Sequence, residues 1–150
     1  MTDLAITRIF DAPRHLVFRA FTDPDQIAAW FGPVGWSVPR DTVDMDVRPG
    51  GHQRFMMVND DDPSMSSPVN AGFTEVIENE LLVGEENVSH IPDFGADVLR
   101  LRIEFHDEPG DRTRLVLIQS PFPEPMHEGA QEGWGSSFTK LDKLLSPVRN

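Results

Sequence analysis

The clearest hydrophobic pattern in the chain lies in the stretch Val98–Phe105. There, apolar side chains at positions 99, 101, 103 and 105 alternate with charged side chains at positions 100, 102 and 104. A period of two predicts a β-strand whose two faces meet different surroundings, one apolar and one aqueous. The pattern therefore indicates an antiparallel sheet that is covered on one face only.

Other short segments have strand character and are separated by turn residues. These predicted strands are Leu4–Phe10, Val43–Val47, Gln53–Val58, Ala71–Ile77, Leu81–Val88 and Arg114–Gln119. In the predicted strand Gln53–Val58, the alternation directs Phe55 and Met57 inward and Arg54 and Met56 outward. The segment Asn59–Pro68 has no hydrophobic period, and we expect a polar loop there.

Two short helices are expected after the first strand. The first, Pro13–Phe21, starts at a proline, whose missing N–H needs no partner in the first helical turn. Asp23, a side-chain cap before Pro24, starts the second, and the pair Gly32-Pro33 ends it.

A long helix, Glu128–Leu145, is expected at the end of the sequence. Its apolar side chains recur at spacings of three and four, at positions 130, 134, 138, 141 and 145. At a rise of 1.5 Å per residue this helix is ~27 Å long, enough to cross a whole sheet. Gly129, Gly133 and Gly135 weaken its first half, and we expect them to serve close packing or bending.

Length and composition narrow the classes of function. A chain of 150 residues fits one domain, so we expect a single domain over residues 1–150. The formal net charge of -12 disfavours nucleic acid and an anionic membrane surface as partners. The chain has no cysteine, which excludes disulfides and thiolate chemistry. The first eight residues lack the pattern of a signal peptide, so we expect a cytoplasmic protein.

The histidines do not predict a metal site. No pair of them has a spacing suited to one shared metal ion. We expect surface or hydrogen-bonded structural roles for all of them, namely His15, His52, His90, His106 and His127. No phosphate-binding motif or nucleophile motif occurs either, so no cofactor and no catalytic residue are predicted.

Neighbouring acidic side chains are the other candidates for catalysis. They lie at Glu85 and Glu86, at Asp60–Asp62, and at Asp44 with Asp46. The simplest interpretation of such charges is a solvated face. A general acid needs a raised pKa and hence an apolar setting, which only Glu75, Glu104 or another pocket-facing acid could have. Alternation puts Glu104 on the charged side of its strand.

Four short motifs, which occur in order along the chain, carry a resemblance. They are Phe10–Pro13 with Val17 and Phe18, Phe21–Pro24 with Trp30–Pro33, Asp46–Gly51, and Gly133 and Trp134 with Leu141, Leu144 and Leu145. Together with the order of elements, they resemble the START-type, birch-pollen-allergen-like superfamily, also called SRPBCC. Within it, the sequence is similar to the bacterial family related to the C-terminal domain of the activator of the ninety-kilodalton heat-shock protein's ATPase.

The resemblance implies an α+β helix-grip fold. In this fold a curved antiparallel sheet of six to seven strands wraps around the long C-terminal helix, and a hydrophobic cavity lies between them. Members of the superfamily bind lipids, sterols, polyketides or plant hormones, and a few are cyclases or aromatases. The co-chaperone role belongs to the eukaryotic namesake, and only fold-level analogy would transfer it.

On this fold we predict binding of a small hydrophobic or amphipathic molecule between the sheet and the long helix, by a monomer or a homodimer. The predicted lining consists of Trp30, Trp36, Phe55, Met57, Phe73, Leu101, Ile103, Gln119, Trp134, Phe138 and Leu141. Either Gln119 or Arg8 would serve as the polar anchor. Two alternatives remain: a cyclase-like or hydrolytic enzyme with an acid or base in the same pocket, and a co-chaperone or stress-response protein that binds a protein partner.

Overall fold

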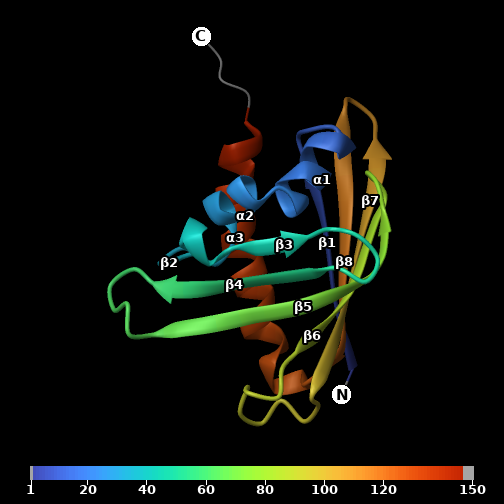
Figure 1. Cartoon of the computed structure of the whole chain (residues 1–150). Helices are drawn as coiled ribbons and strands as arrows, with labels where there is room; N and C mark the ends of the chain where they lie inside the picture. The colour runs from blue at the N-terminus through green and yellow to red at the C-terminus, as the bar shows by residue number, and fades with distance from the viewer. Residues whose placement is uncertain (1, 147–150) are drawn as a thin grey trace.

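The computed structural model of the chain describes residues 2–146, so residues 1 and 147–150 of the predicted single domain lie outside the described residues. An antiparallel sheet bends around one long helix (Figure 1). The strands are β1 (Thr2–Phe10), β2 (Trp36–Ser37), β3 (Asp44–Asp46), β4 (His52–Asn59), β5 (Ser66–Ile77), β6 (Leu81–Asn87), β7 (Val98–Glu108) and β8 (Arg112–Phe122). The helices are α1 (Arg14–Thr22), α2 (Pro24–Trp30) and α3 (His127–Leu145), with short 3-10 helices η1 (Arg40–Thr42) and η2 (Glu124–Met126).

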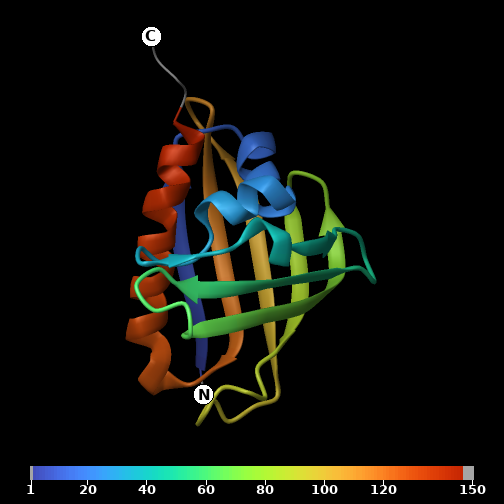
Figure 2. The same cartoon turned by 60° about the vertical axis from the view of Figure 1, so that its left-hand side comes forward.

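The sheet has the order β1-β8-β7-β6-β5-β4-β2, and β3 also pairs with β4. Strands β4 and β5 cross the direction of β1 and β8 steeply, and α3 lies on the concave side between these two parts of the sheet (Figures 1 and 2). The α+β helix-grip fold predicted from the sequence is therefore confirmed. The sheet has eight strands where six to seven were expected, and the shortest is β2, which pairs with the end of β4.

The starts of the two short helices agree with the sequence. The side chain of Asp23 caps α2, and its Oδ1 accepts hydrogen bonds from the backbone N–H groups of Asp25, at 2.8 Å, and Gln26, at 3.4 Å. Helix α1 begins at Arg14, one residue after Pro13. Both short helices lie over the end of the sheet that the C-terminal half of α3 also covers (Figure 1).

The segment Asn59–Pro68 is only in part the polar loop that the sequence predicted. Strand β5 begins at Ser66, and Pro68 lies opposite Met56 of β4. Strand β6 pairs with β5 only from Ala71 onward, so at Pro68 one edge of β5 has no partner strand. Proline is tolerated at such an edge, which is why a polar, proline-containing sequence can extend the strand.

The C-terminal half of α3 is held by large apolar side chains. Phe138 and Leu141 are completely buried. The Phe138 ring stands edge-on to the Phe10 ring of β1, with 5.2 Å between the ring centroids. Outside this contact, the Arg8 guanidinium donates two hydrogen bonds to the Asp142 carboxylate, at 2.9 and 2.6 Å. This half of the helix is therefore fixed to β1 by packing and by an ion pair.

The three glycines in the first half of α3 are not required by a close contact. A Cβ atom placed on Gly129, Gly133 or Gly135 would meet no other atom within 4 Å. The expectation that they serve close packing is therefore wrong. What they do is keep the side-chain volume of this half of the helix small.

Replacing Gly135 should stabilise the protein. Gly135 is exposed within α3, and alanine restricts the unfolded chain more than glycine does. We expect Gly135→Ala to raise the free energy of unfolding by about 1 kcal/mol, measured by urea denaturation. Gly50→Ala is the matched control, because Gly50 has φ 84° in a turn, and this change should lower stability. A loss of stability in Gly135→Ala would show that the helix needs this glycine.

Candidate functional site

Two adjoining cavities lie between the inner face of the sheet and the first half of α3. The larger has a volume of about 280 Å³ and the smaller about 60 Å³. Both are lined by Phe31, Val69, Glu86, Gln119 and Trp134, so these side chains stand where the cavities meet. A mostly apolar wall with a few polar groups is typical of sites for small molecules.

Helix α3 contributes a stripe of mainly small residues to the larger cavity. The stripe consists of Ala130, Gly133, Trp134 and Ser137, spaced by three, one and three residues along one helix face. Only Trp134 is bulky. The space exists because these small side chains do not reach across to the curved sheet. Further along the helix, the large side chain of Phe138 fills the corresponding space.

Aromatic side chains from two other segments form the opposite wall. Phe94, in the connection between β6 and β7, stands edge-on to Phe122 at the end of β8, with 5.5 Å between the ring centroids. Both line the larger cavity together with Val88 and Leu99, and all four are buried. This wall belongs to a small hydrophobic cluster separate from the main core.

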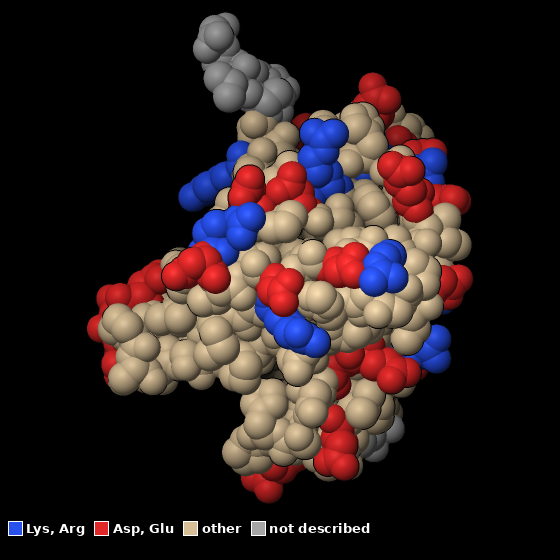
Figure 3. Space-filling view, in the orientation of Figure 1, with Lys and Arg blue, Asp and Glu red and all other residues tan. Residues whose placement is uncertain are grey.

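The larger cavity reaches the surface between two segments of the chain. Its lining includes Ser67 and Pro68 at the start of β5, and His90 and Ile91 in the connection between β6 and β7. A notch separates these two parts of the molecule in Figure 3. On the face shown there, acidic and basic side chains are interspersed, and the basic ones form no continuous patch.

Gln119 is a buried polar side chain on the inner face of β8, opposite Leu101 of β7. Its Oε1 accepts a hydrogen bond from the indole N–H of Trp134, with 3.2 Å between Nε1 and Oε1. This bond links the sheet to α3 where the two cavities meet. It also fixes the orientation of the Trp134 ring, which therefore acts as a rigid part of both walls.

Glu86 places a carboxyl group on the apolar walls of both cavities. The register sets it on β6 between Ala71 of β5 and Leu99 of β7. Burial raises the pKa of this carboxyl from its ordinary value of 4.5 to about 7, because apolar surroundings disfavour the charged form. Near neutral pH the group therefore exists both as acid and as carboxylate.

The structure places part of the predicted lining on these walls. The residues concerned are Met57 on the larger cavity, Phe73, Leu101 and Ile103 on the smaller one, and Gln119 and Trp134 on both. Of the two proposed polar anchors, Gln119 is thus near the space available to a ligand. Contact of these residues with a ligand remains a prediction.

Three large side chains of the predicted lining lie instead in the solid core. Trp30, Phe138 and Leu141 are fully buried and line neither cavity. The indole N–H of Trp30 donates a hydrogen bond to the backbone carbonyl of Ala20, at 2.8 Å, so this ring fastens α2 to α1. Helical spacing correctly predicted that Phe138 faces the sheet, but at that level the Phe10 ring of β1 is in direct contact with it.

Phe55, Trp36 and Arg8 are also placed differently from the prediction. Phe55 is buried behind Phe31, with 4.8 Å between their ring centroids. Trp36 lies on the short strand β2. Neither Phe55 nor Trp36 lines a cavity. Arg8 is bound to Asp142 on the outside of α3 and is therefore not the polar anchor. Phe55 and Arg8 thus have partners within the fold, Phe31 and Asp142.

Sequence reasoning missed Phe31, Glu86, Phe94 and Phe122 as lining residues. Glu86 had a usable signal, because it follows Leu82 by four positions along a strand and so shares its inward face. Phe31 follows the end of α2, where helical spacing no longer indicates the direction of a side chain. Phe94 lies in an irregular segment, where no periodicity indicates direction.

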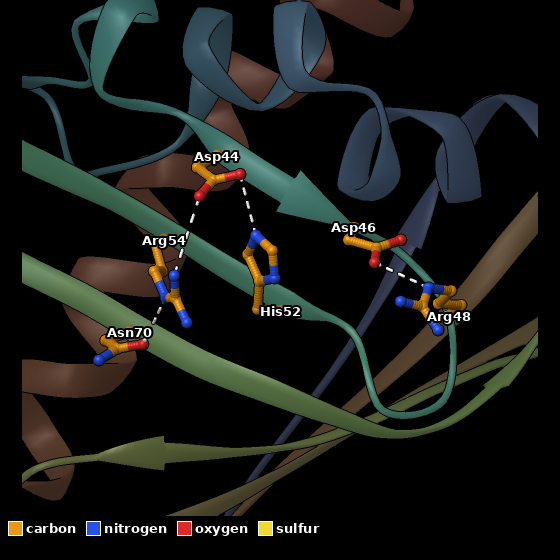
Figure 4. A network of polar contacts seen from close by, with 6 residues as sticks. All are labelled: Asp44, Asp46, Arg48, His52, Arg54 and Asn70. Carbon is orange, nitrogen blue, oxygen red and sulfur yellow. Dashed lines mark hydrogen bonds and ion pairs between the residues drawn. The ribbon is translucent and has the colours of Figure 1, made fainter.

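Polar side chains outside the cavities form partnered surface groups (Figure 4). Asp44 of β3 lies 2.9 Å from His52 Nε2 and 3.9 Å from Arg54 on β4, and Arg48 pairs with Asp46 at 2.7 Å. The hydrogen bond with His52 lowers the pKa of Asp44. An exposed carboxylate held in its charged form is not a general acid, so Asp44 lies on a solvated face, as predicted.

Glu104 behaves in the same way on β7. Hydrogen bonds with Arg102 and His106, both at 2.8 Å, lower the pKa of its carboxyl. Within residues 2–146 no group of three metal-ligating side chains comes together. No helix of this part of the chain is long and apolar enough to cross a membrane.

Comparisons with known proteins agree with the fold. The profile of the family described as Activator of Hsp90 ATPase homolog 1-like protein matches residues 11–146. A crystal structure of a Chromobacterium violaceum protein superposes with a TM-score of 0.83 at 22% identity, covering 98% of this chain and 99% of that one. A crystal structure of a Nitrosomonas europaea protein superposes with a TM-score of 0.79 at 27% identity, covering 96% of this chain and 94% of that one. The solution structure of an AHSA1-like protein from Aeromonas hydrophila gives 0.77 at 21% identity, with 99% of each chain covered. A search of curated proteins gives no significant match.

The buried carboxyl predicts a pH-dependent stability. Because the pKa of Glu86 rises from 4.5 to about 7 on folding, its contribution is intact below pH 4.5 and is lost as the pH rises to about 7. Glu86→Gln should therefore be more stable than the parent by about 3 kcal/mol at alkaline pH, and nearly equal to it in acid, as measured by urea denaturation.

Glu85→Gln is the control for this measurement. Glu85 is the next residue of β6 and is exposed on the outer face, opposite Arg100. Its removal should leave the pH profile of the parent unchanged. Parallel profiles for the parent and Glu86→Gln would contradict the assignment of a raised pKa to Glu86.

Proposed function

The chain belongs to the activator of Hsp90 ATPase homolog 1-like family, and we propose that it binds a small, largely apolar molecule in the larger cavity. The observation that carries this proposal is the space itself. A cavity of about 280 Å³ remains between the sheet and α3 although large side chains pack the other half of the same interface. Unfilled apolar space weakens a fold, so a binding role accounts for keeping it.

The size and chemistry of the walls limit the ligand. The volume of about 280 Å³ lies at the low end of the ~300–1,000 Å³ found for small-molecule sites, which favours a compact molecule. Phe94, Phe122 and Trp134 offer ring faces and edges for apolar contact. Glu86 and Gln119 are the polar groups that stand where the two cavities meet, and they are placed to orient the ligand.

A second function is favoured by one specific observation. With a pKa of about 7, Glu86 can give or take a proton near neutral pH, as a cyclase-like or hydrolytic reaction would require. Among the residues that line the cavities, His90 is the other titratable group, and it lies at the rim. Binding remains the better supported function, because it requires the cavity alone. A co-chaperone interaction remains a prediction from family resemblance.

Native mass spectrometry of the protein purified from its own host tests the proposal directly. A retained molecule would appear as added mass that is lost on denaturation. The complementary measurement is binding of a neutral apolar dye, such as Nile red, to the purified protein. A protein that carries no added mass and does not bind the dye would contradict the proposal.

Filling the cavity from α3 should weaken binding without unfolding the protein. In Gly133→Leu the new side chain starts from the helix face that lines the larger cavity, where a Cβ atom meets nothing within 4 Å. We expect its affinity for Nile red to fall at least tenfold, about 1.4 kcal/mol, in fluorescence titrations. Gly135→Leu makes the same chemical change on the exposed side of α3 and should bind like the parent. Equal affinities for both variants would place the dye elsewhere.

A further inference from the structure

The carboxyl group of Glu86 has no partner of opposite charge in the protein. Among residues 2–146, no ion pair and no side-chain hydrogen bond involves this carboxyl, and burial alone shifts its pKa. The other acids with shifted pKa values, Asp44 and Glu104, each have basic partners within hydrogen-bond distance. The ionised carboxyl of Glu86 therefore has no counter-ion within the described residues. A bound ligand can supply one.

The groups that face Glu86 in the cavities are almost all uncharged. Strand β5 presents Val69 and Ala71, β7 presents Leu99 and Leu101, β8 presents Gln119, and α3 presents Trp134. Phe31, just after α2, completes the set, and His90 of the β6–β7 connection is the titratable group besides Glu86. Neither lysine nor arginine lines either cavity.

This arrangement discriminates between ligand charges. An anionic ligand would bring a second negative charge beside Glu86 with no basic side chain to hold it, which is unfavourable in apolar surroundings. A cationic ligand would instead pair with the carboxylate, and charge-assisted hydrogen bonds of this kind are roughly twice as strong as those between neutral groups. The formal net charge of -12 of the whole chain acts in the same direction.

The aromatic walls favour the same charge. Phe31 and Trp134 stand beside Glu86 on both cavities, and Phe94 and Phe122 line the larger one. The faces of aromatic rings attract ammonium groups, and tryptophan does so most strongly. An apolar cavity that combines such rings with one unpaired carboxyl offers a cation both kinds of contact.

We propose that the ligand of the larger cavity is an organic amine, with its apolar part between α3 and the Phe94–Phe122 pair and its protonated nitrogen against the Glu86 carboxyl. This inference rests on the proposed binding function and specifies the class of ligand. It predicts a preference by charge among molecules of equal length, because Glu86 is the group that distinguishes them.

The preference should depend on pH in a defined direction. Only the ionised form of Glu86 pairs with an ammonium group, and its pKa in the free protein is about 7. The affinity for an amine should therefore rise with pH up to about 7 and then level off. Between about pH 8.5 and about pH 5.5 we expect a loss of roughly 30-fold for the amine and little change for a neutral ligand.

Octylamine, octanol and octanoate form a matched series that tests the proposal. Each displaces Nile red from the intact protein if it enters the cavity, so competition titrations give relative affinities. At about pH 8.5 we expect octylamine to bind at least tenfold more tightly than octanol, and octanoate to bind most weakly. Glu86→Gln should bind octylamine and octanol alike, whereas Glu85→Gln, which changes a residue outside both cavities, should keep the preference and the pH profile of the parent.

The outcomes separate this proposal from the proposed function. If octanol displaces the dye while octylamine shows no advantage, or if Glu86→Gln keeps the advantage, the cavity binds ligands but the assignment to amines is wrong. Tightest binding of octanoate would also overturn it. If none of the three molecules displaces bound dye, the amine proposal fails, whereas the proposed binding function stands or falls with dye binding itself and with its loss in Gly133→Leu.

Discussion

The contact between α3 and the concave face of the sheet determines most of what is special about this molecule. The helix is bulky in its C-terminal half, where Phe138 and Leu141 fill the space against β1 and the two short helices. It is slender in its N-terminal half, where Ala130, Gly133 and Ser137 face the sheet. Because one rigid helix joins the two halves, tight packing at one end holds the other at a distance from the sheet, and the cavities are the result.

The antiparallel register is the second constraint, because it decides which side chains face the cavities whatever their polarity. Residues at every second position of β6, β7 and β8 point inward, so Glu86 and Gln119 share a face with Leu82, Leu101 and Leu117. Gln119 is satisfied by Trp134. Glu86 has no such partner within the described residues, so its carboxyl faces the cavities unpaired.

The fold could be predicted from the sequence because its signals are local. The alternation in Val98–Phe105, the cap at Asp23 and the long apolar stripe of α3 each indicate an element on their own. The start of β5 could not be found this way, since Ser66 and Pro68 read as a loop and join the sheet only through β4. The cavity walls were harder still. Periodicity shows that a side chain such as Phe138 points inward, but whether it meets space or another ring depends on what the far strand places opposite.

The position of the tryptophans gives the molecule an internal optical reporter. The chain has three tryptophans and no tyrosine, so the indole rings account for its near-ultraviolet emission. Trp30 is sealed in the core, whereas Trp134 borders both cavities and shares its N–H with Gln119. Any molecule that enters displaces solvent from the surroundings of the Trp134 ring, while Trp30 and Trp36, which line neither cavity, supply the background emission. The wavelength and intensity of the protein's intrinsic fluorescence therefore report whether the cavity is occupied, and no label is needed.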